Sequence, residues 1–315
     1  MGCVIGIDTS CYTTSIACVG EDGSILGSFR KLLPVEVGQR GLRQSEGVFH
    51  HVKQLPMVAE EMFHTVSRQP ILAVGVSASP RDGEDSYMPV FSVGEAHARV
   101  LAASLGVPCF RSTHQRGHVR AAQVDAGLNE GPFLAVHLSG GTTEMLAMNE
   151  GDLRLIGGTK DLHAGQLVDR IGVAMGLEFP AGPHLERLAL QGAAKAILPV
   201  SMADGDMHCH FSGAETKLVG LLKNGGIEKN DAAMEIYDLL GRTIARMLKA
   251  GADATGYRQA LVAGGVASSA LFRKVLIQRV AKLDRRLKVC FGKPEYSGDN
   301  AVGAALLALE KLRKG

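Results

Sequence analysis

The sequence of 315 residues is long enough for two lobes of ordinary domain size. Its 34 Lys and Arg against 32 Asp and Glu leave a formal net charge of +2, which excludes a broad polyanion-binding surface and leaves room only for a local basic patch. With 46% hydrophobic and 21% charged residues the chain is not largely disordered, and no apolar run reaches the roughly 18 residues of a membrane span. The start, Met1 to Asp8, lacks the basic segment of a signal peptide, and Gly6 stands where myristoylation requires Ser or Thr. We therefore expect a cytoplasmic protein with no membrane association.

The cysteines are scattered and form no Cys-x-x-Cys pair, which favours reduced thiols in a chain that can build its own core. Cys209 stands between His208 and His210. Adjacent residues on a strand alternate faces and rarely bind one ion, so these three residues are a weak metal site. The six positions are Cys3, Cys11, Cys18, Cys109, Cys209 and Cys290.

Strands alternate with helices along the whole chain, which predicts an α/β fold. In the first half, strands are expected at 3–8, 15–19, 25–29 and 72–76, and helices at 48–66 and 93–105. Ser112 or Thr113 can cap a further helix that carries His114. In the second half, strands are expected at 133–138, 144–148, 153–157 and 259–262, and helices at 165–175, 183–190, 232–250, 268–282 and 300–312.

The first strands repeat at mid-chain. A strand, a loop of small polar residues, a strand, an acidic turn and a third strand occupy 3–29 and again 133–157. The pattern predicts two similar lobes, each opening with a meander, although chance likeness of two hairpins is the alternative.

His114 and His118 lie one helical turn apart, a spacing that suits two ligands of one divalent metal. A complete site needs a carboxylate from elsewhere; otherwise the two are ordinary surface histidines. Asp299, just before the last predicted helix, can supply it, but an N-cap is the commoner role for Asp299 and Asn300 at such a position.

Two strand ends that carry glycines indicate a nucleotide-binding site. Residues 139–143 offer backbone N–H groups and hydroxyls that can hold a phosphate, or form an ordinary hairpin turn. Gly264 and Gly265 end a buried strand and precede a helix whose N-terminus can face an anion. Neither segment is a Walker loop or a dinucleotide motif.

Single charged residues are less informative. Asp161, Asp169 and Glu186 can bind ribose hydroxyls or simply be solvated helix acids. Two basic groups can contact a nucleic acid backbone, although most basic runs are solvated. They are Arg30, Lys31, Arg40 and Arg43, and Arg279, Lys282, Arg285, Arg286 and Lys288.

Taken in order, these segments resemble the tRNA threonylcarbamoyladenosine transferases, formerly called O-sialoglycoprotein endopeptidases, over nearly the whole chain. The family's opening Gly-Ile-Glu-Thr-Ser-Cys is close to Gly6 to Cys11, and its His-x-x-x-His matches His114 and His118. Its Ser-Gly-Gly-x-Thr loop matches Ser139 to Thr143. Further matches are Ala164 to Arg170, Pro180 to Pro183, Phe211 to Thr216, Ala263 to Ala267, and Asp299 with Asn300.

The resemblance implies a fold of the actin, sugar-kinase and heat-shock-chaperone type, in which two related lobes enclose a nucleotide. The expected lobes are residues 1–112 with the C-terminal helix 301–315, and residues 113–300, which bind metal and nucleotide. The implied activity is transfer of a threonylcarbamoyl group from threonylcarbamoyl-AMP to N6 of adenosine in tRNA. A divalent iron or zinc would polarise the carbamoyl carbonyl and orient the phosphate leaving group. Implied partners are tRNA, a smaller paralogue of actin-like fold and an accessory ATPase.

The resemblance also implies the site residues. His114, His118 and Asp299 would hold the metal, and Asp8, Thr9 and Ser10 would belong to the catalytic strand end. The adenylate would be held by Ser139, Gly140, Gly141, Thr142, Thr143, Asp169, Gly182, Glu186, Gly264, Gly265 and Ser269.

Several positions depart from the family. Tyr12 and Thr13 replace an acidic pair thought to assist proton transfer, and Ser269 replaces an Asn that contacts the base. Gln166 replaces Glu, Glu215 replaces Lys, and residues 38–45 also differ. These departures leave two alternatives: a divergent paralogue that binds an adenine nucleotide or carbamoyl-adenylate and acts on another acceptor, or a non-catalytic scaffold. A metalloprotease is disfavoured because Gln115 stands where its catalytic Glu would be.

Overall fold

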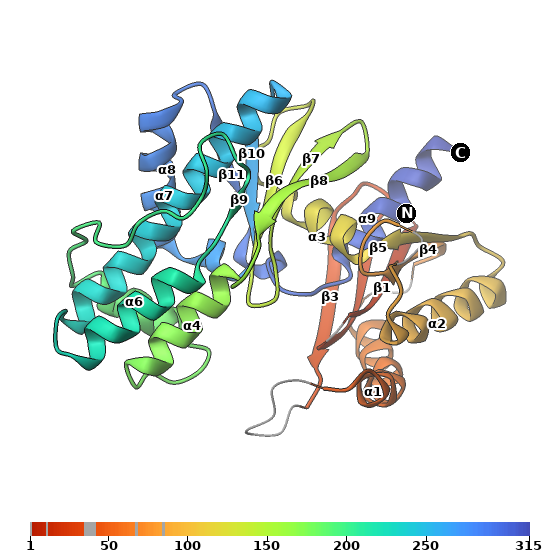
Figure 1. Ribbon diagram of the computed structural model, residues 1–315. Helices are drawn as coiled ribbons and strands as arrows, with labels where there is room; N and C mark the ends of the chain where they lie inside the picture. Colours follow the sequence, from red (N-terminus) through yellow and green to blue (C-terminus); the bar gives the residue numbers. More distant parts are fainter. Residues whose placement is uncertain (1, 11, 35–41, 67–68, 84–85) are drawn as a thin grey trace. The chain divides into compact units, whose positions relative to one another are not determined.

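A computed structural model describes residues 2–10, 12–34, 42–66, 69–83 and 86–315 (Figure 1). Cys11, Arg40 and the first half of the divergent segment 38–45 therefore lie outside the described residues. The chain forms two compact units, one of Met1–Val124 with Gly298–Gly315 and one of Asp125–Ser297. Unlike the ranges expected from the sequence, these units put His114, His118 and Asp299 together in the first unit.

The first unit is built on a five-stranded sheet of order β3-β2-β1-β4-β5. β1, β2 and β3 form the expected antiparallel meander, and β4 and β5 add in parallel beside β1. The strands are β1 (Cys3–Ser10), β2 (Thr13–Gly20), β3 (Ile25–Leu32), β4 (Ile71–Ser79) and β5 (Cys109–Thr113). The helices are α1 (Gln44–Thr65), α2 (Pro89–Leu105), α3 (His114–Ala122) and α9 (Val302–Lys314).

Alternation along β1 assigns its side chains to two different layers. Ile5 and Ile7 join the core formed with α1 and α2, which share one side of this sheet (Figure 1). Gly6 faces α9 instead, and a Cβ there would lie 2.2 Å from the carbonyl oxygen of Ala301. Asp8 shares the α9 side of the strand with Gly6 and reaches α3.

Helices α3 and α9 pack at very close range. A Cβ at Gly303 would lie 1.9 Å from the carbonyl oxygen of Gly117, so only glycine permits this contact. Thr113 begins α3 as expected, because its side chain accepts a hydrogen bond from the backbone of Arg116. This packing brings the residue that precedes α9 by three positions, Asp299, toward the histidines of α3.

The second unit has a six-stranded sheet of order β11-β10-β6-β7-β8-β9. The stretch β8-β7-β6-β10-β11 repeats the order and strand directions of the first sheet, which confirms the predicted repeat. The strands are β6 (Phe133–Leu138), β7 (Thr143–Asn149), β8 (Asp152–Thr159), β9 (His208–Cys209), β10 (Gln259–Ala263) and β11 (Lys288–Phe291). The helices are α4 (Ala164–Ala174), α5 (Gly182–Ala189), α6 (Ser212–Lys223), α7 (Lys229–Thr255) and α8 (Ala270–Leu283), with short 3₁₀ turns at Val266–Ser268 and Pro294–Tyr296.

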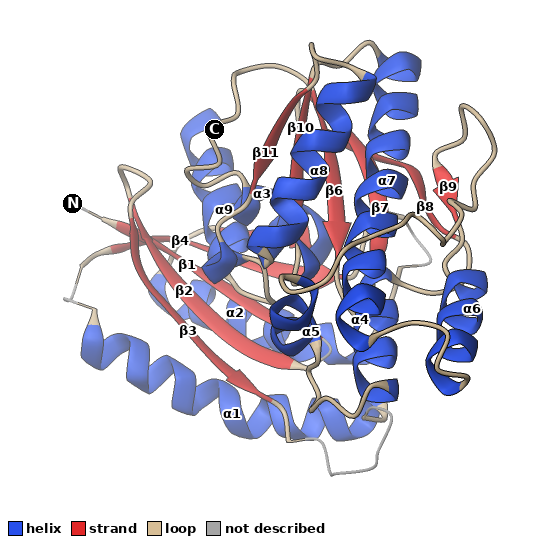
Figure 2. Cartoon of the chain, turned by 90° about the vertical axis from the view of Figure 1, so that its left-hand side faces the viewer, coloured by secondary structure: helices blue, strands red, loops and turns tan. Residues whose placement is uncertain are grey.

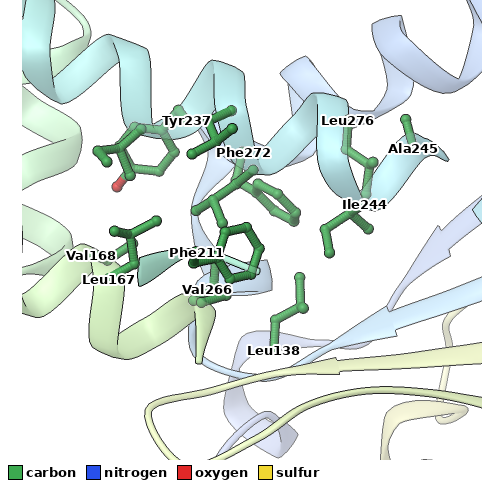
Figure 3. Close-up of a cluster of buried hydrophobic side chains, with 14 of the residues drawn as sticks. Leu138, Leu167, Val168, Phe211, Tyr237, Ile244, Ala245, Val266, Phe272 and Leu276 are labelled. Carbon is green, nitrogen blue, oxygen red and sulfur yellow. The ribbon is translucent and has the colours of Figure 1, made fainter. Parts of the chain in front are cut away.

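The core of the second unit lies between this sheet and its helices. Helices α7 and α8 run side by side (Figure 2). Phe211, Tyr237 and Phe272 fill the space above Leu138 at the end of β6 (Figure 3). This core includes residues at the ends of β6 and β10, where the two glycine-bearing segments begin. Within the described part of the chain, no helix is both long and apolar enough to cross a bilayer.

Candidate metal and nucleotide sites

His114, His118 and Asp299 form a group of three potential metal ligands within the first unit. One ligand atom from each lies within 4.8 Å of the others. His118 Nε2 is 2.9 Å from His114 Nε2 and 3.2 Å from Asp299 Oδ1, and His114 Nε2 is 3.5 Å from the same oxygen. Asp299 does not cap α9, because Asn300 accepts the hydrogen bond from the backbone of Val302 at 3.0 Å. Asn300 thus bonds the start of α9, and the carboxylate of Asp299 lies beside the two histidines.

Asp8 orients the first of these histidines. Its Oδ2 lies 2.8 Å from His114 Nδ1, and its Oδ1 accepts a hydrogen bond from the backbone of Ser10 at 3.0 Å. A carboxylate that accepts from Nδ1–H fixes the tautomer and leaves the lone pair on Nε2, where His118 and Asp299 converge. Asp8 is 1% exposed, so its carboxylate has these partners in place of water.

The carboxylates of Asp8 and Asp299 interact strongly with the imidazole of His114. Burial disfavours a charge on its imidazole, but the carboxylates of Asp8 and Asp299 outweigh burial and raise the pKa of His114 well above its ordinary value. Burial likewise opposes ionisation of Asp299, yet hydrogen bonds from His114 and His118 hold its pKa well below the usual range. The site therefore keeps both carboxylates ionised and attracts positive charge.

This donor set fits a divalent metal ion. Ligand atoms about 2.1 Å from one ion are separated by about 3.0 Å at octahedral angles and about 3.4 Å at tetrahedral angles. The separations between the three ligand atoms, 2.9, 3.2 and 3.5 Å, fall close to this range. A metal would bind the neutral form of both imidazoles, so the two ionised carboxylates would leave two negative charges, which a divalent cation balances. Two histidines and one carboxylate suit iron(II) or zinc.

The other two residues of the predicted catalytic strand end have different surroundings. Thr9 is fully buried and faces α2, where its hydroxyl donates to the carbonyl of Val90 and accepts from the backbone of Gly94. Its side chain therefore ties β1 to α2 and lies on the face opposite Asp8. Ser10 is on the Asp8 side, and its buried hydroxyl has no hydrogen-bond partner among the described residues.

A fully buried histidine next to this strand end was missed by sequence reasoning. His51 of α1 lies 2.8 Å from the hydroxyl of Thr14, which also donates to Gln54 Oε1 at 3.0 Å. The amide of Gln54 in turn donates to the carbonyl of Leu32. Burial lowers the pKa of His51 to about 4. The only sequence signal was His51 at helical spacing from Leu55 and Val58 on the apolar face of α1.

The second unit contains a cavity of about 350 Å³. This volume lies within the range of roughly 300–1,000 Å³ typical of small-molecule sites. Seven of the eleven predicted nucleotide residues line it, namely Ser139, Gly140, Asp169, Gly182, Glu186, Gly265 and Ser269. Its other walls are Gly165, Val168, Pro180, Pro183, Tyr237, Val266 and Ser268.

The Ser139 loop is fixed against the start of α4. The backbone of Gly165 donates to the Ser139 carbonyl at 3.1 Å, and a Cβ at Gly165 would lie 2.6 Å from the backbone of Gly140. Thr143 is buried and accepts a hydrogen bond from the backbone of Ala164 at 2.8 Å. A Cβ at Gly140 or Gly141 would meet no described atom within 4 Å, so the backbone of these two glycines is open to a ligand.

The remaining predicted nucleotide residues support the loop without lining the cavity. Gly141 and Thr142 form its tip, and Thr143 ties it to α4. Gly264 is left-handed with φ +102°, and a Cβ there would meet the Leu138 carbonyl oxygen at 2.3 Å. Glycine at this position is thus required by packing between β10 and β6.

Two carboxylates enter the cavity from α4 and α5. Asp169 accepts a hydrogen bond from the backbone of Ala181 at 2.8 Å, and Glu186 accepts one from the backbone of Leu271 at 2.8 Å. Burial raises the pKa of Asp169, and the Ala181 amide opposes that rise. The third candidate, Asp161, instead accepts hydrogen bonds from the backbone N–H groups of Phe211 and Ser212 at the start of α6.

Several departures from the family have local roles. Gln166 accepts from the backbone of His163 at the start of α4, and Glu215 forms an ion pair with Arg170 at 3.3 Å. Tyr12 is 42% exposed and Thr13 is buried. Neither supplies a carboxylate.

Much of the basic segment is engaged within its own unit. Arg279 pairs with Asp238, Arg286 pairs with Asp284, and Lys288 donates to the Gly127 carbonyl. At the other basic group, Arg43 pairs with Glu46. His208 pairs with Asp206, and burial raises the pKa of the Cys209 thiol to about 12.

Comparison with known families identifies the chain. The model of the family TsaD, tRNA N6-adenosine threonylcarbamoyltransferase, matches residues 45–306. The chain belongs to this family. The matched range contains all three potential metal ligands and the whole wall of the cavity.

Solved structures share the fold at low sequence identity. HypF of T. kodakarensis is 13% identical with a TM-score of 0.65, over 99% of this chain and 48% of HypF. A ROK family glucokinase from Streptomyces griseus, in complex with glucose and AMPPNP, is 16% identical with a TM-score of 0.57 over both full chains. The activator of the 2-hydroxyisocaproyl-CoA dehydratase from Clostridium difficile, with bound ADPNP, is 14% identical with a TM-score of 0.56, over 99% of this chain and 96% of that one. These likenesses establish the actin-like ATPase and sugar-kinase fold.

Proposed function

We propose that the protein transfers a threonylcarbamoyl group from threonylcarbamoyl-AMP to N6 of adenosine in tRNA, and that the transfer depends on a divalent metal. The observation that carries this proposal is the group of His114, His118 and Asp299, with Asp8 orienting His114. Family membership supports the reaction type, and the donor set supports the metal.

The adenylate half of the donor is assigned to the cavity of the second unit. The open backbone at Gly140 and Gly141 suits a phosphate, and the uncommitted carboxylate oxygens of Asp169 and Glu186 suit ribose hydroxyls. Each carboxylate is held by a backbone N–H donor, so its second oxygen points in a defined direction. These contacts bind and orient the donor and require no movement during the reaction.

The carbonyl half is assigned to the first unit. A metal held by His114, His118 and Asp299 would act as a Lewis acid that stabilises negative charge on the carbamoyl oxygen. In the reaction the N6 nitrogen bonds to the carbamoyl carbon, the bond from that carbon to the phosphate oxygen breaks, AMP leaves with the electron pair, and the amine loses one proton. Asp8 is a positioning residue in this scheme, because both its oxygens are engaged by His114 and Ser10.

Transfer from synthetic threonylcarbamoyl-AMP to purified tRNA tests the proposal. The metal-loaded protein, with its partner proteins added, is expected to produce threonylcarbamoyladenosine, and Asp299→Asn is expected to lower the rate at least a hundredfold. His210→Ala serves as the matched control, because this exposed histidine lies outside the ligand group. Equal rates for Asp299→Asn and wild type would refute the metal role.

A second candidate is a carbamoyl-adenylate enzyme with a different acceptor. Tyr12 and Thr13 favour it, because the described end of the β1–β2 connection carries no carboxylate to accept the amine proton. This candidate predicts AMP release in the presence of a small-molecule amine and no dependence on tRNA. Product formation that requires tRNA would exclude it.

We also propose that the protein works with a smaller paralogue of actin-like fold and an accessory ATPase. Helices α1 and α2 carry large apolar side chains in contact with solvent, among them Phe49, Val52 and Val100 at 54%, 49% and 67% exposure. Between these helices lies an apolar groove of about 450 Å³ lined by Leu55, Pro56, Phe63, Val100 and Leu101. Such a surface supports a protein-binding role. A scaffold without turnover would use the same surface, and any metal-dependent product excludes that alternative.

A further inference from the structure

An arginine of the edge strand β3 extends toward the potential metal ligands of the first unit. Arg30 lies directly opposite Ser15 on β2, and Ser15 lies directly opposite Asp8 on β1. Residues opposite each other on neighbouring strands share a face of the sheet, so Arg30 lies on the face of Asp8. Its guanidinium follows this direction, because a Cβ at Gly298 would lie 3.2 Å from Arg30 Nη1. Gly298 directly precedes Asp299 in the chain.

The charge of Arg30 is not used within the described part of the chain. Its guanidinium is exposed and forms no hydrogen bond or ion pair with another described residue. The two carboxylates of the metal-ligand region have other partners, since Asp8 is bonded to His114 and Asp299 to His118. An arginine is ionised at any pH at which the protein folds and can only donate hydrogen bonds. Its N–H groups are therefore available to an anionic ligand.

The rest of this face carries hydroxyl groups. Ser10 and Thr13 lie opposite each other where β1 and β2 end, on the same face as Asp8 and Arg30. The Ser10 hydroxyl is buried and has no hydrogen-bond partner among the described residues. Among the described residues of β1, β2 and β3, this face has Asp8 as its single carboxylate and Arg30 as its single cation. These strand ends therefore present hydrogen-bond donors beside the metal ligands.

Charge and bond lengths both favour a carboxylate as the anion. A divalent ion would balance Asp8 and Asp299, so Arg30 adds one positive charge that a singly charged anion neutralises. The phosphate of the proposed donor is assigned to the second unit, whereas its threonyl group carries a carboxylate. Three bonds of about 1.3–1.5 Å join the carbamoyl carbon to the carboxylate carbon, so these two atoms lie at most about 4.3 Å apart. A guanidinium binds a carboxylate through two parallel N–H···O bonds.

We propose that Arg30 binds the carboxylate of the transferred acyl group and thereby selects carbamoyl donors derived from amino acids. The proposal rests on the proposed function, because it requires the carbamoyl carbonyl of the donor to lie at His114, His118 and Asp299. Arg30 contacts the substrate in this scheme and determines specificity. It takes no part in the exchange of bonds at the carbamoyl carbon.

Isothermal titration of the metal-loaded full-length protein with two adenylates tests the proposal. One is a sulfamoyl analogue of threonylcarbamoyl-AMP that resists hydrolysis, and the other is the same molecule without its carboxylate. The wild-type protein is expected to bind the first at least tenfold more tightly, as a charge-assisted pair of hydrogen bonds provides. Arg30→Gln should weaken only the first and bring the two dissociation constants within threefold. Arg30→Lys should keep part of the preference, because an ammonium group attracts the carboxylate without the planar fork.

Lys31→Gln is the matched control. Lys31 carries the same charge one residue away, but it lies on the opposite face of the sheet, where its Nζ is 3.9 Å from Met57 Sδ of α1. This variant should keep the wild-type preference. A similar loss of preference in Lys31→Gln would show a general effect of net charge and would overturn the role of Arg30.

The remaining outcomes separate this proposal from the proposed function. Equal weakening of both analogues by Arg30→Gln would place Arg30 at the sulfamoyl group, which stands for the phosphate. Unchanged constants for both analogues, with weaker binding of tRNA, would place it at the nucleic acid backbone. Either result overturns the proposal and leaves the proposed function intact. Failure of the wild-type protein to bind either analogue at millimolar concentration would refute the proposed donor, and this inference with it.

Discussion

Asp8 and Asp299 are two carboxylates that meet one histidine from opposite sides, and their roles differ. Asp299 lies beside the Nε2 atoms of His114 and His118, which are the atoms that would bind a metal. Asp8 is instead hydrogen-bonded to Nδ1 on the other side of the His114 ring. Asp299 is a direct ligand in our proposal and Asp8 fixes the orientation of the imidazole. The two substitutions to Asn should therefore have graded effects.

We predict that Asp299→Asn removes most bound metal, whereas Asp8→Asn weakens metal affinity by about 10–100-fold, the usual effect of losing a carboxylate behind a histidine ligand. Competition with a chelator, read by elemental analysis, measures both. His210→Ala should match wild type. Unchanged affinity in Asp8→Asn would show that the hydrogen bond to His114 does not orient the ligand.

His51 gives a prediction for the pH dependence of stability. Its pKa of about 4 in the folded state is lower than the ordinary value of 6.5, so the unfolded chain binds a proton first as pH falls. The stability that neutral His51 contributes is then fully present above about pH 6.5 and is lost as the pH falls toward 4. The loss is about 1.4 kcal/mol per pKa unit, or about 3 kcal/mol in all. His51→Asn keeps a donor for Thr14 and removes the titration.

Urea unfolding at several pH values between 4 and 7 measures this difference. The unfolding free energy of His51→Asn should fall about 3 kcal/mol less than that of wild type across the range. The matched control is His64→Asn, an exposed histidine on the same helix, which should follow wild type. Parallel curves for wild type and His51→Asn would contradict the assignment.

At the scale of elements, the geometry of the ligand group depends on the contact of α3 with α9. Gly303→Ala puts a methyl group 1.9 Å from the Gly117 carbonyl oxygen, so the helices must separate. We expect a loss of about 1–3 kcal/mol of stability, typical of overpacking, together with weaker metal binding because Asp299 moves. Gly220→Ala in α6, where a Cβ meets nothing within 4 Å, should instead stabilise by about 0.5–1 kcal/mol. Equal melting temperatures and metal affinities for Gly303→Ala and wild type would refute this role.

Apolar periodicity located the main elements but not their ends. The first turn of α1 is polar and begins at Gln44, where Arg43 and Glu46 bond each other, so the apolar pattern marked only the part from residue 48. Strand β11 was missed because it is short and begins at Lys288, the last residue of the basic segment. Helix α6 was missed because its first residues were interpreted only as a motif. Periodicity reports the buried face, whereas caps and edge strands depend on partners distant in sequence.

The candidate sites, too, could be predicted from the sequence only in part. Spacing alone indicated the histidine pair, because residues one turn apart share a helix face. The choice between ligand and cap for Asp299 required the position of Asn300, and the bond from Asp8 to His114 spans 106 residues. The hydrogen bond from the Tyr237 hydroxyl to the Gly182 carbonyl likewise joins α7 and α5, which only tertiary packing brings together.

For the whole molecule, the groove of α1 and α2 gives a prediction about assembly. Val100→Asp places a charge on its most exposed apolar side chain and should abolish co-purification with the smaller paralogue, since an unpaired charge in an interface is costly. Leu190→Asp, with 66% exposure against 67%, is the matched control in the second unit. Both variants should melt within about 2 °C of wild type, as surface changes usually do. Retention of the paralogue by Val100→Asp would place its binding surface elsewhere.

In our proposal this chain modifies tRNA although Tyr12 and Thr13 replace an acidic pair. The most direct test is a mass-spectrometric count of threonylcarbamoyladenosine in tRNA from cells in which this protein alone can perform the transfer. We predict normal levels of the modified nucleoside with the wild-type chain and loss of it with Asp299→Asn. No modified adenosine, from protein shown to be folded and metal-loaded and with its partners present, would contradict the proposed function.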